Sequence, residues 1–161
     1  MKVVINPGGG LDHVAISAAV EKALEASLKG GAMLIANDMK TSVARGPKTG
    51  RIYTTRFRRN RTTGRIFPTE QRVPHQASAP GEAPATDTGK LVGSIVADGK
   101  GMAVYVEARS LYAVWLEYGT RYMAARPFFM PAIERNRERI NELIRASVAT
   151  AVAQFRLKGK S

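Results

Sequence analysis

The longest hydrophobic pattern in the chain has the period of an α-helix. Its large apolar residues recur at helical spacing: Ile16, Val20, Leu24, Leu28, Ile35, Met39 and Val43. This spacing places them on one face of a helix from about Asp12, a favourable N-cap, to about Val43. Gly30 and Gly31 lie inside this helix, where each glycine is unfavourable by roughly 1 kcal/mol relative to alanine. The pair indicates a kink or a close backbone contact.

Two further helices are predicted in the C-terminal third of the chain. Ser110 is placed to cap a short helix, and Gly119 closes it as a C-cap glycine does. The apolar residues of this short helix are Leu111, Val114, Trp115 and Tyr118. Pro131 suits the first turn of a long last helix. The apolar stripe of that helix comprises Ile133, Ile140, Ile144, Val148, Val152 and Phe155.

The segments between these helices predict two antiparallel hairpins. Val92–Ala97 and Met102–Glu107 flank Asp98-Gly-Lys-Gly101, a strong turn signal because its glycines accept positive φ. Residues 51–57 have high β-propensity, and residues 64–67 can pair with them. Together with the two long helices, the hairpins predict an α+β fold in which the helices cover a small antiparallel sheet.

Positive charge is concentrated in residues 45–72. This window holds nine of the 25 basic residues and one of the 13 acidic residues, in a chain of formal net charge +12. Such a chain is attracted to polyanions. Because a hairpin with nine cations cannot pack into its own subunit without burying unpaired charge, we expect it to project as an arm. The arginines expected to contact a partner are Arg51, Arg56, Arg58, Arg59, Arg61 and Arg65.

The length and composition fit one soluble domain, which we place at residues 1–161. Within it, residues 45–88 combine the basic arm with a segment from Pro68 to Thr88 that is rich in Pro, Ala, Gly, Ser and Thr and is expected to be extended. The chain has no cysteine, so it cannot form disulfides or a cysteine-type zinc site. No stretch is long and apolar enough to span a bilayer, and we expect a cytoplasmic protein without a membrane partner.

The sequence shows no arrangement of residues typical of catalysis. His13 and His75 are the only histidines and lie in unrelated contexts, so no metal site is expected. Ser94 and Ser110 lack a nucleophile elbow or a nearby histidine. Glu117 could serve as a general acid, but no second carboxylate is placed to work with it. We therefore expect an ion pair for Glu117, no catalytic residue and no cofactor.

Three short motifs follow one another in the second half of the chain. Residues 77–95 contain Thr88-Gly-Lys-Leu-Val-Gly-Ser94, residues 112–120 end in Glu117-Tyr-Gly-Thr120, and residues 125–132 contain Arg126-Pro-Phe128 before the last helix. In this order and spacing, the motifs resemble the tail-completion (head–tail joining, or neck) family of long-tailed bacteriophages. The resemblance covers residues 77 to about 142. The basic arm belongs to a subset of that family.

The resemblance implies a structural virion protein. Members form a closed ring, usually six-fold, between the connector or stopper of the head and the tail terminator or tail tube. Genomic DNA passes through the channel of such a neck, and host cytoplasm is the site of assembly. The motif residues then act as scaffold, with an ion pair from Arg126 to Glu117, tight turns at the glycines and an anchor at Phe128. These scaffold residues are Gly89, Glu117, Gly119, Arg126, Pro127 and Phe128.

Two alternative functions remain open from the sequence. A tail-terminator ring occupies the same end of the tail and is the nearest alternative. A DNA- or RNA-binding protein acting through the arginine arm is the second, and it would bind nucleic acid with a steep salt dependence. We favour protein partners for the arm, because arginines gripping phosphate would oppose the passage of DNA.

Overall fold

The computed structural model describes residues 13–60 and 62–158. The elements follow in the order α1 (His13–Arg45), β1 (Ile52–Arg59), β2 (Ile66–Gln76), α2 (Lys90–Ser94), β3 (Ile95–Lys100), β4 (Ala103–Ala108), α3 (Ala113–Tyr118) and α4 (Phe129–Lys158). The predicted α+β fold and its two long helices are confirmed. No helix within these described residues is long and apolar enough to cross a membrane.

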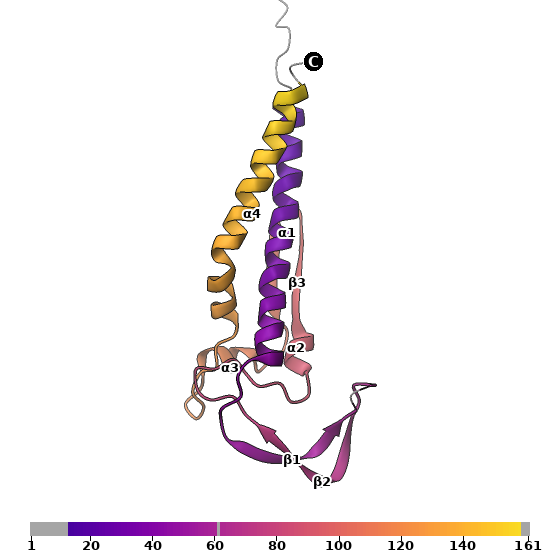
Figure 1. Ribbon diagram of the computed structural model, residues 1–161, viewed down its shortest axis with the longest axis vertical. Helices are drawn as coiled ribbons and strands as arrows, with labels where there is room; N and C mark the ends of the chain where they lie inside the picture. The colour runs from indigo at the N-terminus through magenta and orange to yellow at the C-terminus, as the bar shows by residue number, and fades with distance from the viewer. Residues whose placement is uncertain (1–12, 61, 159–161) are drawn as a thin grey trace, which may run out of the picture.

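Helix α1 is the central element of the fold. It packs along antiparallel α4 on one side and against the β3–β4 hairpin on the other (Figure 1). Gly31 lies at the helix contact, where a Cβ atom would be 3.1 Å from Cγ2 of Ile140, so the close contact expected near this glycine is confirmed. On the same two helices, Asp38 accepts hydrogen bonds from Arg135 at 3.0 Å and Asn136 at 2.9 Å.

The core lies at the end of the bundle where α1 finishes and α4 begins. Its largest fully buried side chains are Met39, Val43, Ile95 and Phe128. They come from α1, β3 and the residue just before α4, and burying each contributes roughly 1.5–3 kcal/mol. Towards the far end of the bundle the apolar residues of both helices, such as Leu24 and Val148, are only half-buried. The end of the bundle that contains this core therefore supports α3 and the arm.

The two hairpins form separate two-stranded sheets, β1–β2 and β3–β4. Strand β3 starts at Ile95 and not at the predicted Val92, because Lys90–Ser94 forms the short helix α2, which buries Leu91. Strand β2 is longer than predicted and runs to Gln76, so the first part of the segment expected to be extended belongs to the arm. Prolines are tolerated in β2 because every strand of a two-stranded sheet is an edge strand.

The β1–β2 hairpin projects from the base of the bundle (Figure 1). Its register runs from Ile52 opposite Gln76 to Arg59 opposite Ile66, with a shift between Thr55 and Phe57. At the tip, the side chain of Asn60 accepts hydrogen bonds from the backbone N–H groups of Thr62 and Thr63. The projecting arm expected from the charge distribution is thus present, and it is bent near its middle.

Candidate functional site

The carboxylate of Glu117 joins α3 to the start of α4. Its Oε2 atom accepts hydrogen bonds from the backbone N–H groups of Phe128 at 2.8 Å and Phe129 at 2.9 Å, and its Oε1 atom accepts one from Met130 at 2.9 Å. Glu117 is buried, and the ring of Phe128 lies in the core. The first N–H groups of a helix have no acceptor within the helix and carry partial positive charge. A buried carboxylate both accepts their hydrogen bonds and balances this charge. Glu117 is therefore a scaffold residue, as expected, with a different partner.

The predicted ion pair between Glu117 and Arg126 is wrong. No such pair lies within the part of the chain that the structure describes, because both oxygens of the carboxylate already accept α4 amides. Arg126 instead donates from Nε to the backbone oxygen of Ser78 at 3.2 Å, and its own N–H donates to the Leu116 carbonyl at 2.7 Å. Arg126 thus ties the proline-rich segment to the loop between α3 and α4.

Both motif glycines occupy the turns expected of them. Gly119 ends α3 with φ of 77°, and a Cβ atom there would lie 2.8 Å from the carbonyl oxygen of Met123. Gly89 precedes α2 with φ of 78°. Positive φ of this kind costs little only for glycine. Pro127 lies between Arg126 and the buried ring of Phe128, directly ahead of α4, and it lacks the N–H group that would otherwise need a partner there.

The exposed face of α3 carries large apolar side chains. Ser110 does not cap this helix as predicted, because the N-cap residue is Tyr112 without a side-chain hydrogen bond. The buried face of the helix consists of Ala113 and Glu117. We call the exposed residues the α3 stripe; they are Leu111, Val114, Trp115, Tyr118 and Tyr122, and the last lies in the loop after the helix. Exposed apolar groups gathered on one face mark an interaction site.

A small hollow of about 210 Å³ adjoins the α3 stripe. Its walls include Val114 and Tyr118 from the stripe, and Phe129 and Met130 from α4. Because Glu117 lies in the floor and holds both helices together, the hollow and the stripe form one rigid surface. Aromatic residues beside such a hollow are typical of residues that dominate binding energy at protein interfaces.

The predicted basic residues of the arm lie along β1 and next to both strands. Arg51 and Arg65, next to the strands, are exposed. Arg56, Arg58 and Arg59 belong to β1, and the predicted contact residue Arg61 lies outside the described residues. The arm also exposes Ile52 and Ile66. It therefore offers apolar as well as positively charged groups to a partner.

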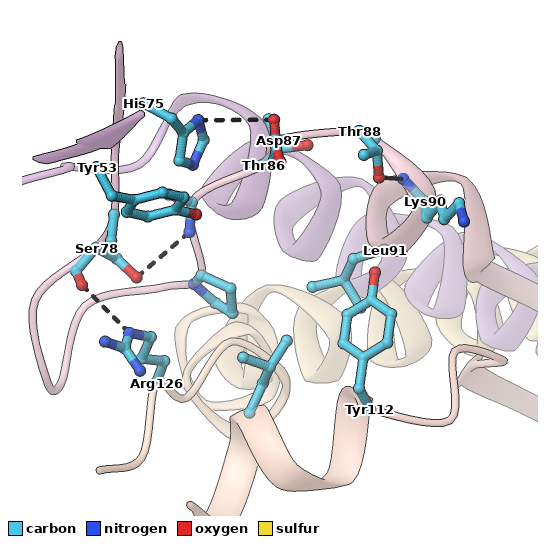
Figure 2. A pocket seen from close by; sticks show the side chains of 15 residues that line it. Tyr53, His75, Ser78, Thr86, Asp87, Thr88, Lys90, Leu91, Tyr112 and Arg126 are labelled. Atoms are coloured by element: carbon cyan, nitrogen blue, oxygen red, sulfur yellow. Dashed lines mark hydrogen bonds and ion pairs between the residues drawn. The ribbon is translucent and has the colours of Figure 1, made fainter. Parts of the chain in front are cut away.

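A pocket of about 530 Å³ lies where the arm meets the body (Figure 2). Tyr53 and His75 come from the arm, with ring centroids 5.1 Å apart, and Tyr112 reaches in from the opposite wall. Nδ1 of His75 lies 3.8 Å from Oδ1 of Asp87. Burial, helped by the negative charge of Asp87, raises the pKa of the Tyr53 hydroxyl. The His75–Asp87 contact joins the base of the arm to the body.

The described side chains include no candidate metal site. Within residues 13–60 and 62–158, no group of three or more His, Asp or Glu side chains could hold a metal ion. The single unsatisfied buried side-chain oxygen of these residues is Oγ1 of Thr86, in the wall of the pocket at the arm base. What the arrangement provides is two outward-facing surfaces, the α3 stripe and the arm, on one rigid base.

Comparisons of the chain with protein-family models, with curated proteins and with solved structures found no match. The function proposed below therefore depends on the motifs and surfaces of this chain.

The exposure of the α3 stripe was not predicted from the sequence, because the spacing of its residues is also that of a helix face packed on a core. One signal was available. Tyr112 to Tyr118 is apolar almost all round, with Glu117 as its one charged residue. A helix with no polar face on the surface of a small domain cannot bury every side against its own chain.

Proposed function

We propose that this protein is a structural subunit of a tailed bacteriophage, forming a ring at the head–tail junction that completes the tail and joins it to the head connector. The motif residues that resemble the tail-completion family support this proposal through what they contact. Glu117, Gly119, Arg126 and Phe128 all hold α3, its loop and α4 together. Residues with such contacts serve a scaffold better than a reaction.

The observation that carries the proposal is the α3 stripe. A chain that fixes a short helix with a buried carboxylate and then exposes Trp115 and Tyr118 on it is arranged for association. Exposing such side chains in a lasting monomer would favour aggregation. In a ring, each copy uses one surface to contact the next copy and another to be contacted, which is a heterologous interface. The arm and the stripe are two such surfaces.

The test of this proposal is a reconstruction of the assembled particle. We expect the chain in a cyclic, six-fold ring between the head connector and the tail. An isologous dimer as the sole assembly in particles would overturn the proposal. A role as tail terminator would instead appear as overlong tails in particles made without the protein, whereas loss of a completion protein leaves finished tails separate from heads.

A nucleic-acid-binding role is the second candidate, favoured by the charge of the arm. Its test is the affinity of the isolated protein for duplex DNA at several salt concentrations. If the arm binds phosphates, log K falls linearly with log salt, with a slope of roughly −0.9 per phosphate contacted. Binding that is weak at physiological salt leaves the protein–protein role as the explanation of the arm.

A further inference from the structure

Within residues 13–60 and 62–158, no part of the chain covers the α3 stripe. Leu111 is 91% exposed, Tyr118 75% and Tyr122 89%. The side of α3 that faces the body is occupied by Ala113 and Glu117, so the helix cannot rotate to bury the stripe without losing the cap on α4. The surface is fixed in the orientation that a partner meets.

The arm of the same chain cannot cover this stripe. Figure 1 shows α3 and the loop that follows it on the left of the bundle base, whereas the distal half of the arm and its tip lie on the right. The base of the arm is joined to the body by His75, whose Nδ1 lies 3.8 Å from Oδ1 of Asp87. Copies placed side by side in one orientation therefore bring the arm of one towards α3 of the next.

The two surfaces are chemically complementary. The stripe supplies one Trp and two Tyr rings, and the arm supplies exposed arginines, including Arg51 and Arg65. Guanidinium groups pack favourably on Trp and Tyr rings through cation–π contacts and stacking. The chain already contains one such contact, with the guanidinium carbon of Arg121 5.7 Å from the ring centroid of Tyr122. The exposed Ile52 and Ile66 of the arm add apolar area suited to the same face.

Net charge disfavours an acidic surface of the neighbouring copy as the partner of the arm. Outside residues 45–72 the chain has 16 basic and 12 acidic residues, so the body of a neighbouring copy offers no acidic surplus to nine cations. Glu107 and Asp38, two acidic groups of that body, already pair with Arg109 and Arg135. An aromatic face attracts arginine without requiring free carboxylates.

We propose that the arm of one copy lies across the α3 stripe of the neighbouring copy. This contact rests on the proposed ring, because it is heterologous and each copy both gives an arm and receives one. It assigns Trp115, Tyr118 and Tyr122 as the receiving residues. It assigns the exposed side chains beside and on the arm strands, such as Arg51 and Ile66, as the docking residues.

The experiment exploits the absence of cysteine from the chain. Three single-cysteine proteins are made: Thr54→Cys on the arm, Val114→Cys on the stripe and Ala149→Cys on the exposed side of α4, and all three positions are exposed. Differently tagged pairs are mixed and treated with a short bismaleimide crosslinker. We expect the arm–stripe adduct in at least fivefold higher yield than the arm–α4 adduct. Equal yields overturn the proposal.

A second variant separates docking from general charge effects. Adding Arg51→Gln and Arg65→Gln to the arm protein should lower the arm–stripe yield severalfold. The matched change Arg137→Gln with Arg139→Gln, at exposed positions of α4, should leave it unchanged. If duplex DNA protects the arm cysteine from maleimide while no arm–stripe adduct forms, the arm binds nucleic acid and the proposal is overturned.

The same experiments separate this inference from the proposed function. If the protein forms rings in particles but the purified protein gives no arm–stripe adduct, the proposed contact is overturned and the proposed ring stands. If the purified protein gives the adduct but the protein is absent from particle necks, the virion role is overturned and the proposed contact stands.

Discussion

The carboxylate of Glu117 accepts the backbone N–H of Phe128 at 2.8 Å, while the Phe128 ring is 1% exposed in the core. One residue pair therefore fixes both the position of α3 and the starting point of α4. The cap uses the whole carboxylate, since Phe129 and Met130 donate to it as well. The orientation of the α3 stripe depends on this cap.

Replacing Glu117 by alanine should lower the free energy of unfolding by about 2–4 kcal/mol, because buried amides lose a charged acceptor. Urea denaturation followed by circular dichroism measures this change. The control is Glu138→Ala, at an exposed position on α4, which should stay within about 0.5 kcal/mol of the unsubstituted protein. Equal effects of the two substitutions would contradict the capping role.

Replacing Gly119 by alanine should destabilise the protein by about 1–3 kcal/mol, because the residue has φ of 77° and a Cβ atom would lie 2.8 Å from the Met123 oxygen. Gly93→Ala is the matched control, since a Cβ atom there meets nothing within 4 Å. Thermal unfolding compares the two variants. A Gly119→Ala protein as stable as Gly93→Ala would show that the turn tolerates a side chain.

The stability of the arm base should depend on pH through Glu82. Hydrogen bonds from the Thr49 hydroxyl and from the Ala79 and Thr49 N–H groups lower the pKa of this carboxyl below its ordinary value of 4.5. A depressed pKa in the folded state stabilises the protein above the unfolded-state pKa, and this stabilisation is lost as the pH falls through the folded-state value.

Glu82→Gln should therefore be less stable than the unsubstituted protein at pH 7, and the difference should shrink as the pH falls below about 4.5. Urea denaturation at pH 7 and at pH 3 measures both differences. A difference that stays constant between these two pH values would show that the Glu82 carboxylate is not the group responsible.

Replacing Arg58, Arg59 and Arg61 by glutamine should leave the melting temperature nearly unchanged and lower the yield of joined particles. The arm projects from the body, so its tip contributes little to folding. The matched control replaces three exposed arginines of α4 by glutamine: Arg137, Arg139 and Arg145. Mixing tails with heads and counting joined particles by electron microscopy is the measurement. If the arm variant joins heads and tails normally, the arm serves only as a solubilising loop.

The elements that the sequence predicted well are those specified by local patterns. The period of four from Ile16 to Val43 determines α1, and Gly119 determines the end of α3 because few other residues adopt its φ. The arm followed from charge, since the nine cations of residues 45–72 have no place in a core. In each case the physical cause lies within a few residues along the chain.

Glu117 and the α3 stripe could not be predicted in the same way. Glu117 bonds to amides 11 to 13 residues later, and Arg126 bonds to Ser78, 48 residues earlier, so both partners depend on how the loops fold over the core. The spacing of Leu111, Trp115 and Tyr118 defines one apolar face. It does not show whether other parts of the chain cover that face.

The two long helices, the glycine turns and the concentration of charge on the arm could be predicted from the sequence alone, because these depend on local conformation and composition. Which side of α3 is buried depends on tertiary packing: Ala113 and Glu117 are buried, and Trp115 and Tyr118 face outward. The reason is that the first backbone N–H groups of α4 need an acceptor, which Glu117 supplies. A carboxylate that satisfies them in the core fixes the rotation of its own helix, and that rotation turns the large apolar residues to solvent.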